Sequence, residues 1–261
     1  MDLGLTGKVV IVTGGSKGIG LACARAFLTE GVRVAIVSRS QMNLNAALGE
    51  LAAPGGDLIA LPCDLTGRGA AQPMVAEVEQ RLGPVDILIN SAGAARRHLP
   101  EDLNDEAWHA AMDAKYFTYI HAMNAVLPLM AKRGRGVVVN IIGMGGKVAS
   151  PIHLGGGAAN SALMLATVGL ANAYGPKGIR INAINPGVTI TDRLRERLKL
   201  EAKTRGLPED ETLAQLQAKV PLKRYALPED IANLALFLAS GKASYITGAI
   251  IPMDGGSNPV L

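Results

Sequence analysis

A glycine-rich turn near the start of the chain has the spacing of a phosphate-binding site. The segment Gly14-Gly15-Ser16-Lys17-Gly18-Ile19-Gly20 follows the apolar run Val9–Val12 and precedes a helical pattern. Gly14 and Gly18 can take backbone angles closed to other residues, and without Cβ atoms they let a diphosphate approach the free N–H groups of the next helix. The spacing differs from the commoner Gly-x-Gly-x-x-Gly fingerprint. It predicts a dinucleotide site, with a turn that holds no ligand as the alternative.

Such a turn needs a strand before it and a helix after it, and the chain repeats this alternation. Runs rich in Val and Ile are typical of strands buried on both faces of a parallel sheet. Strands are expected at about 9–12, 31–38, 57–61, 85–90, 137–142, 179–185 and 249–253, helices at about 19–29, 41–53, 66–82, 105–132, 157–173 and from 228, and a turn at 54–56. The predicted fold is α/β, a single-domain doubly wound (Rossmann-type) parallel sheet of about seven strands with helices on both faces, and its ligands bind at the carboxyl ends of the strands.

Composition and charge narrow the class of protein. The chain has 261 residues, of which 49% are hydrophobic, so we expect one domain over 1–261. A charged segment at about 191–222 predicts a helical cap insertion with a solvated face. The net charge is +4, but aromatic residues make up only 3%, so we expect no nucleic-acid partner. Cys23 and Cys63 have no metal-ligand spacing, and we expect no metal site.

The chain is also expected to be cytoplasmic and to have no membrane partner. No uninterrupted apolar run reaches the ~18 residues of a membrane span. At the start, Met1-Asp2-Leu3-Gly4 places no basic region before a hydrophobic one, so no targeting segment is expected there.

Several motifs, in order along nearly the whole chain, resemble those of the short-chain dehydrogenase/reductase family. The turn Thr13–Gly20 is similar to its cofactor turn, and Asn90-Ser91-Ala92-Gly93 to its Asn-Asn-Ala-Gly motif. Pro186-Gly187 with Thr191 resembles the segment that holds the nicotinamide amide, and Asp64 the acid on the adenine side. The resemblance implies a dinucleotide bound by Gly14, Ser16, Lys17, Gly18, Ile19, Gly20, Ser38, Arg39, Asp64, Leu65, Asn90, Ala92, Gly93, Pro186, Gly187, Val188 and Thr191.

The end of the second expected strand bears on the choice of cofactor. In the family, an acid there binds the ribose hydroxyls and favours NAD, whereas this chain has Ser38 followed by Arg39. A 2′-phosphate would repel a carboxylate and attract Arg39 and Lys17 through charge-assisted hydrogen bonds. We therefore expect NADP(H) as the cofactor. The alternative is that both cations only face solvent.

The catalytic residues implied by the resemblance are all changed. The family's Ser aligns with Gly143, its Tyr-x-x-x-Lys pair with Gly156 and Asn160, and its helix Asn with Lys115. Hydride reduction of a carbonyl leaves an alkoxide that needs a proton donor, and a positioned acid contributes about 10²–10⁴-fold. Ordinary carbonyl reduction should then be slow unless another residue donates. The two glycines also predict an enlarged substrate pocket.

Two residues are candidates for a replacement donor, both as catalytic predictions. Lys115 has a long side chain beside the vacated space, although it can instead fill volume or bind an acidic substrate. His153, three residues before Gly156, is the His of the loop that lines the site, although such residues are more often solvated or packed. Tyr119 lies on the same helical face as Lys115. We expect Tyr119 at a subunit interface, because the family pairs its long helices into a homodimer or homotetramer.

We therefore predict an NADP(H)-binding oxidoreductase of short-chain dehydrogenase/reductase type. It would act on a small-molecule substrate, a carbonyl, an alcohol or an activated alkene, by a non-standard proton-delivery route. The alternative is a catalytically silent NADP(H)-binding regulatory or partner protein. Motifs similar to those that fix the nicotinamide end favour the enzyme, because a sensor of the nucleotide need not orient that end.

Overall fold

Seven short strands form one parallel sheet in a computed structural model, which describes residues 2–51, 57–93 and 96–258. The strands are β1 (Val9–Thr13), β2 (Arg33–Ser38), β3 (Leu58–Pro62), β4 (Ile87–Asn90), β5 (Gly136–Ile141), β6 (Ile179–Pro186) and β7 (Ile250–Met253). Their order is β3-β2-β1-β4-β5-β6-β7, and every neighbouring pair is parallel. The winding reverses between β1 and β4. The expected Rossmann-type sheet is confirmed.

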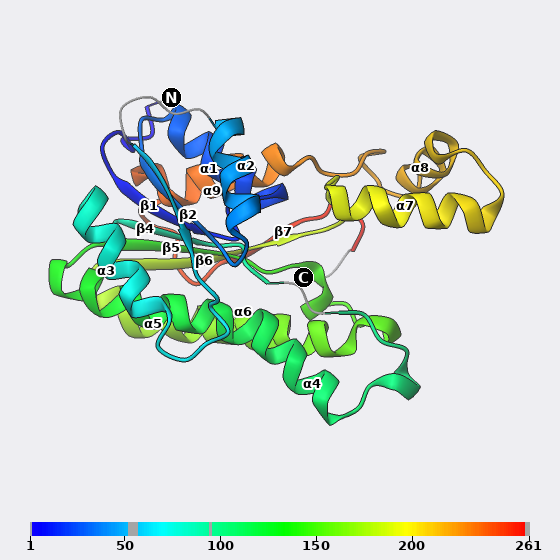
Figure 1. Ribbon diagram of the computed structural model, residues 1–261, viewed down its shortest axis with the longest axis horizontal. Helices are drawn as coiled ribbons and strands as arrows, with labels where there is room; N and C mark the ends of the chain where they lie inside the picture. Colours follow the sequence, from blue (N-terminus) through cyan, green and yellow to red (C-terminus); the bar gives the residue numbers. More distant parts are fainter. Residues whose placement is uncertain (1, 52–56, 94–95, 259–261) are drawn as a thin grey trace.

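Helices cover both faces of this sheet (Figure 1). They are α1 (Gly18–Thr29), α2 (Gln41–Leu51), α3 (Ala71–Leu82), α4 (Asp105–Ala111), α5 (Thr118–Arg133), α6 (Leu154–Tyr174), α7 (Asp192–Arg205), α8 (Glu209–Gln217) and α9 (Pro228–Ala239). One core packs α1, α2 and α9 against side chains such as Val10 and Val12. The other packs α3, α5 and α6 against the opposite face, which includes Val9 and Ile11. The alternation of β1 side chains between the two cores follows from the two-residue period of a strand.

Some expected boundaries were wrong, each for a local reason. The helix expected from Thr66 begins at Ala71, because the carboxylate of Asp64 accepts hydrogen bonds from Thr66 and holds a turn there. The helix expected at 157–173 begins earlier, at Leu154. The helix expected at 105–132 is α4, a π-helical segment (Met112–Phe117) and α5 in succession. The turn expected at 54–56 lies outside the described residues.

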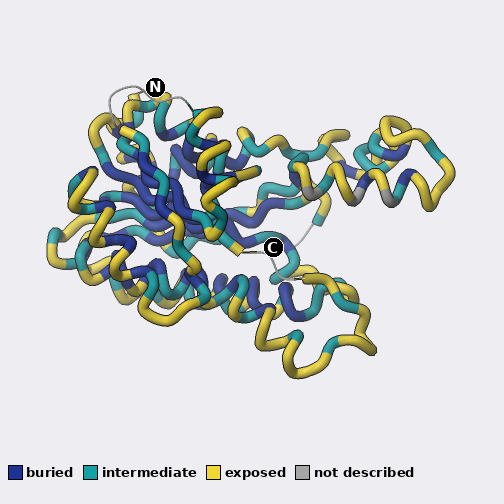
Figure 2. Tube along the Cα trace, viewed as in Figure 1, coloured by how far each residue is buried: buried dark blue, intermediate teal, exposed yellow. Residues whose placement is uncertain are grey.

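The charged segment at 191–222 contains α7 and α8, which project from the sheet and its helical layers (Figure 1). Figure 2 shows that most of this arm is exposed. Leu198 and Ala202 of α7 are nevertheless buried, as is Thr212 of α8, so the two helices pack on each other. A helical insertion is present where the sequence predicted one, and its role as a cap stays a prediction.

One helical stretch, Pro151–Lys177, is long and apolar enough to cross a membrane by length and composition. The expectation from the sequence concerned an uninterrupted apolar run, and His153, Asn160 and Asn172 interrupt this one, so that expectation is not contradicted. Much of the stretch, however, packs on the sheet through α6, where Leu163, Thr167 and Ala171 are buried. Its outer face exposes Leu165 and Val168, and an oligomer formed through that face stays a prediction.

A buried polar chain connects the carboxyl ends of three central strands to α6. Thr13 Oγ1 of β1 donates to Asn90 Oδ1 (3.2 Å), and Asn90 Nδ2 donates to Asn140 Oδ1 (3.0 Å). Asn140 Nδ2 then donates to Thr167 Oγ1 (3.0 Å), which donates to Leu163 O (2.7 Å). Thr13, Asn90, Asn140 and Thr167 are fully buried, so each bond replaces one to water. This series of hydrogen bonds holds together the strand ends beside which the candidate site lies.

Thr167→Val should lower the free energy of unfolding by about 1–3 kcal/mol, because it removes the oxygen acceptor of the buried Asn140 amide. The remaining acceptor is the weak sulfur of Met123, 3.6 Å away. Thr29→Val is the matched control, since Thr29 is an exposed helical Thr whose hydroxyl also donates to the carbonyl four residues earlier. Urea denaturation measures both. An equal loss of unfolding free energy in the two variants would contradict a special role for the buried hydrogen bonds.

Candidate active site

The glycine turn packs so closely that it admits no side chain at its key positions. Gly14 has a φ of +67°, and a Cβ there would lie 2.8 Å from the backbone nitrogen of Ala92. A Cβ on Gly20 would overlap the carbonyl oxygen of Gly14. The first turn of α1 therefore lies against the end of β1, with the backbone of the turn open to a ligand. This cradle fits a diphosphate, because backbone N–H groups and the helix dipole both favour anions.

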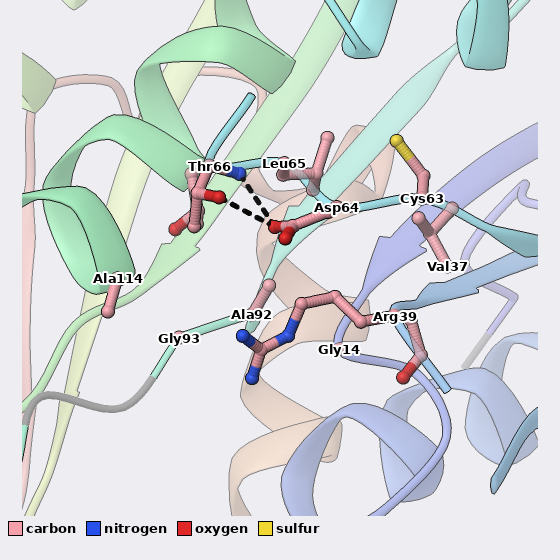
Figure 3. A pocket seen from close by; sticks show the side chains of 12 residues that line it. Gly14, Val37, Arg39, Cys63, Asp64, Leu65, Thr66, Ala92, Gly93 and Ala114 are labelled. Atoms are coloured by element: carbon pink, nitrogen blue, oxygen red, sulfur yellow. Dashed lines mark hydrogen bonds between the residues drawn. The ribbon is translucent and has the colours of Figure 1, made fainter. Parts of the chain in front are cut away.

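Beside the turn, a cavity of about 150 Å³ gathers many of the predicted cofactor residues. Those that line it are Gly14, Ser38, Arg39, Asp64, Leu65, Ala92 and Gly93. Figure 3 shows Arg39 and Asp64 projecting into this pocket, with Ala92 and Gly93 on its wall. Residues from the ends of β1, β2 and β4 and the loop after β3 thus converge at the switch point of the sheet.

One acidic side chain, Asp64, and one basic side chain, Arg39, line this pocket. The Asp64 carboxylate accepts from Thr66 N (3.0 Å) and Thr66 Oγ1 (2.8 Å). The backbone hydrogen bond, more than any other favourable contact, lowers the pKa of Asp64, and the charge of Arg39 adds to the effect. Asp64 is therefore a fixed anion in the pocket, and Arg39 is its cation.

Two predicted cofactor residues, Lys17 and Asn90, do not line this pocket. Lys17 is exposed and lines cavities on the other side of the turn, with Gly18 and Thr191, so it does not meet Arg39 in the pocket above. The Asn90 side chain is fully buried and hydrogen-bonded in the interstrand network, to Thr13 and Asn140. Ser16 is buried beside Lys17 in the cavity bounded by α1 and α2.

A second cavity, of about 500 Å³, brings the nicotinamide-side motif to Lys115. Its lining includes Gly18, Ile19, Pro186, Gly187 and Thr191, all predicted to bind cofactor. Lys115 reaches it from the π-helical segment between α4 and α5. Gly93 permits this approach, since a Cβ there would overlap Ala114 O and lie 3.2 Å from Lys115 Cα. The structure therefore brings Lys115 to the place where reaction chemistry is expected.

The ammonium of Lys115 is buried and held in one position. Only 8% of the residue is exposed, and its Nζ donates to Tyr119 Oη (2.8 Å) and to Ile141 O (3.2 Å). Tyr119 Oη donates in turn to Ile141 O (2.5 Å). Burial raises the pKa of the Tyr119 phenol, so it stays protonated. The expectation that Tyr119 lies at a subunit interface is wrong, because its side chain is fully buried behind Lys115.

His153 occupies the space that a side chain at Gly156 would need. A Cβ on Gly156 would lie 2.6 Å from Nε2 and 2.9 Å from Nδ1 of the His153 ring. His153 is the residue before α6, so its ring folds back over the first turn of that helix. The expectation of a pocket enlarged at Gly156 is therefore wrong. An imidazole fills the volume into which a residue at 156 would project.

A third cavity, of about 770 Å³, lies beyond Lys115 and shares Gly143, Pro186, Gly187 and Thr191 with the second. His153 and Asn160 line it, as does Val188. Two polar atoms in its wall, His153 Nδ1 and Asn160 Oδ1, are buried without a hydrogen-bond partner among the described residues. Buried polar atoms are rarely left unpaired, so the described residues leave some hydrogen-bonding capacity of these two side chains unused.

The surroundings of His153 keep its ring neutral at pH 7. Burial lowers the pKa of His153, and the positive charges of Arg97 and Lys115 lower it further. A neutral imidazole has one donor and one acceptor nitrogen, which lets it hydrogen-bond a carbonyl or a hydroxyl. The site therefore combines a buried cation with a neutral imidazole.

Sequence reasoning found some of these residues and missed others. The four-residue spacing of Lys115 and Tyr119 indicated a shared helical face, but not that the face is buried. Arg96 and Arg97, which line the third cavity, were not among the predicted site residues. They follow the Asn90-Ser91-Ala92-Gly93 motif closely, and a pair of cations after a strand end was a signal that could have been used.

Comparisons with known proteins agree with this geometry. A family model described as "Enoyl-(Acyl carrier protein) reductase" matches residues 14–258. D-beta-hydroxybutyrate dehydrogenase of Rhizobium meliloti is 31% identical over 252 residues, which cover 95% of this chain and 98% of that protein. L-sorbose reductase of Gluconobacter frateurii, solved with NADPH and L-sorbose, is 29% identical, covers 100% of both chains and has a TM-score of 0.92.

A third relative is also known from a solved structure. The NADPH-bound short-chain oxidoreductase of Pseudomonas aeruginosa PAO1, described as containing an atypical catalytic centre, is 32% identical with a TM-score of 0.89. The match covers 97% of this chain and 98% of that one. Fold, motif order and relatives agree, and the chain therefore belongs to the short-chain dehydrogenase/reductase family of oxidoreductases.

Proposed function

We propose that this protein is an NADP(H)-dependent oxidoreductase that interconverts a small carbonyl compound and its alcohol, with Lys115 as the proton donor for reduction. The observation that carries the proposal is the buried Lys115 ammonium, fixed by Tyr119 and Ile141 in the cavity lined by Pro186, Gly187 and Thr191. An ammonium so placed is a positioned acid, which is the group that the family's missing Tyr would otherwise supply.

The nucleotide cradle supports NADP(H) as the cofactor. The glycine turn fits a diphosphate, and Arg39 offers a guanidinium in the adjoining pocket where a ribose-binding acid would favour NAD. Relatives solved with NADPH are consistent with this choice. When bound, NADPH supplies the hydride, and the protein must supply the proton.

Lys115 and Tyr119 divide the work of proton delivery. The Nζ atom of Lys115 gives a proton to the alkoxide oxygen, directly or through a water molecule. Tyr119 accepts a hydrogen bond from that Nζ and donates its own proton to Ile141 O, so it orients the ammonium without titrating. Tyr119 is thus a positioning residue. The cation also stabilises the developing negative charge on oxygen.

His153 is proposed to orient the substrate carbonyl through a hydrogen bond. His153→Ala should lower kcat/KM at least tenfold, whereas His153→Gln, which keeps a neutral donor, should retain more activity. Gly156→Ala should also lower it, because the new methyl group displaces the ring. Gly169→Ala in the same helix is the control, since its Cβ meets no atom within 4 Å. Steady-state kinetics at saturating NADPH measure all four, and unchanged kcat/KM in His153→Ala would remove His153 from the mechanism.

The same residue gives a pH prediction with a defined sign. Because the pKa of His153 is lower in the folded protein than in the unfolded chain, protons bind the unfolded chain more readily. Stability should fall as the pH drops through the unfolded value of about 6.5. His153→Gln lacks this proton uptake, so its melting temperature should decline less than that of the wild type between pH 7.5 and pH 5. Parallel declines would contradict the buried, neutral ring.

The proposed function is tested by NADPH consumption with a panel of aldehydes, ketones and keto acids. Oxidation of NADPH at 340 nm, dependent on one class of carbonyl, is the expected result. Binding of NADPH with no turnover of any carbonyl, alcohol or activated alkene would contradict it. The relatives give no support to that silent alternative, since those described above are named as dehydrogenases, reductases or oxidoreductases.

A further inference from the structure

We propose that the substrate of this site carries an anionic group that binds Arg96 and Arg97 while its carbonyl accepts a hydrogen bond from His153. This inference rests on the proposed function and deepens it, because it names the substrate class. Both arginines line the same 770 Å³ cavity as His153 and Asn160. The class is a small carbonyl compound with a carboxylate or a phosphate ester.

The lining of this cavity is positively charged. Its charged residues are Arg96 and Arg97, and no Asp or Glu is among the described residues that line it. The adjoining second cavity is lined by two acids, Asp192 and Glu196 of α7, together with Lys17 and Lys115. A concave wall with charges of one sign attracts ligands of the opposite sign. Two adjacent guanidinium groups are suited to a carboxylate or a phosphate.

Two residues in the cavity wall have buried polar atoms without a hydrogen-bond partner in the part of the chain that the structure describes. Only 5% of Asn160 is exposed, and its Oδ1 has no hydrogen-bond partner among the described residues. His153 Nδ1 is in the same condition, two helical turns away in sequence and in the wall of the same cavity. A buried amide and imidazole left unpaired cost free energy unless a ligand completes them. A protonated ring nitrogen of His153 can donate to the carbonyl oxygen of a substrate, and Asn160 Oδ1 can accept from the hydroxyl of the alcohol form.

The wall between these polar groups is apolar, which suits a carbon skeleton. Ile142, Met144, Val188 and Leu194 contribute side chains to the lining. The charge of Arg97 also acts on the His153 ring, whose pKa it lowers, so the two residues are within electrostatic reach of each other. Because both residues line one cavity, a molecule of a few carbons is proposed to contact both ends. Hydrophobic contact favours its middle and the arginines favour its anionic end.

The test compares charged and neutral partners of the same skeleton in the NADPH assay. The pairs are 4-oxopentanoate and its methyl ester, acetoacetate and its methyl ester, and dihydroxyacetone phosphate and dihydroxyacetone. We expect at least a tenfold higher kcat/KM for the anionic partner of one or more pairs, and a decrease of that preference in 0.5 M salt. Preference for a keto acid identifies a carboxylate, and preference for the phosphate ester identifies a phosphate.

Arg96→Gln/Arg97→Gln is the matched double variant, and Arg81→Gln, in an exposed pair with Glu77 on α3, is the control. The double variant should lose at least tenfold in kcat/KM on the anionic compound and stay within twofold on its neutral partner. Equal rates on both partners, or equal losses on both, would overturn the inference and leave the proposed function standing.

A binding measurement separates the two failures. If no compound is turned over, the proposed function fails, and ligand-observed NMR with 4-oxopentanoate and with dihydroxyacetone phosphate still tests the anion site. Binding to the wild type that is lost in the double variant and kept in Arg81→Gln would uphold the site. Absence of binding to the wild type, or equal binding to the wild type and the double variant, would overturn it.

Discussion

Lys115→Met is expected to lower kcat for carbonyl reduction by about 10²–10³-fold while the Kd for NADPH stays within twofold. The reason is the loss of the positioned acid, whose contribution is typically about 10²–10⁴-fold. Met has a similar length and is apolar, so it can fill the buried site without leaving a cavity. Stopped-flow measurement of a single turnover isolates the chemical step, and quenching of protein fluorescence measures NADPH binding.

Two further variants distinguish a chemical role of Lys115 from a structural one. Lys132→Met, at an exposed position on α5, should leave kcat unchanged. Tyr119→Phe should reduce kcat by a smaller factor and shift its pH profile, since it removes the hydrogen bond that orients Nζ but leaves the ammonium. If Lys115→Met reacts at the wild-type rate, Lys115 fills volume only. If Tyr119→Phe and Lys115→Met lose equally, Tyr119 does more than position.

The fold could be predicted because each strand is short, β-branched and followed by a turn. Val9–Val12 and Ile87–Ile89 have the continuous apolar pattern that only a sheet covered on both faces requires. Boundaries were less predictable where side chains bond to the local backbone. Asp64 shows this, since its carboxylate caps Thr66 and delays α3 by five residues relative to the expected start. Hydrophobic periodicity does not record such a bond.

The candidate site was predictable on the cofactor side and less so on the reaction side. Glycines such as Gly14 and Gly20 are required by close backbone packing, so a spacing motif identifies them. The ring of His153 fills the space at Gly156 through a fold-back at the start of α6, which depends on local backbone angles. The prediction that His153 replaces the missing proton donor came from its closeness to Gly156 in the sequence. That its ring occupies the space of a side chain at Gly156 could be seen only in the structure.

The pairing of Tyr119 with Lys115 shows the same limit. Helical spacing placed both on one face, but which face is buried depends on how the segment Met112–Phe117 turns against the loop after β4. That segment is π-helical, so the ordinary 3.6-residue period misplaces the side chains that follow it. The π-helical segment and its contact with the loop after β4 therefore determine that Lys115 and Tyr119 are buried, which the sequence did not predict.

Arg39→Gln is expected to raise the Kd for NADPH about 10–100-fold and to leave the Kd for NADH within twofold. NADPH differs from NADH by a 2′-phosphate, and a charge-assisted hydrogen bond to such a group is worth about 1.5–3 kcal/mol. Arg39 is the cation in the pocket lined by Ser38 and Asp64, so the loss should fall on the phosphate alone. Isothermal titration calorimetry with each nucleotide measures the two constants.

The variants around Arg39 determine which cation reads the phosphate. Lys17→Gln should affect NADPH less than Arg39→Gln, because Lys17 lines the cavities on the other side of the glycine turn. Arg81→Gln, on the surface of α3, should change neither constant. Ser38→Asp should weaken NADPH and strengthen NADH, since a carboxylate repels the phosphate and binds the ribose hydroxyls. Equal affinity of Arg39→Gln and the wild type for NADPH would instead show that Arg39 faces solvent, and a larger loss in Lys17→Gln would assign the phosphate to the glycine turn.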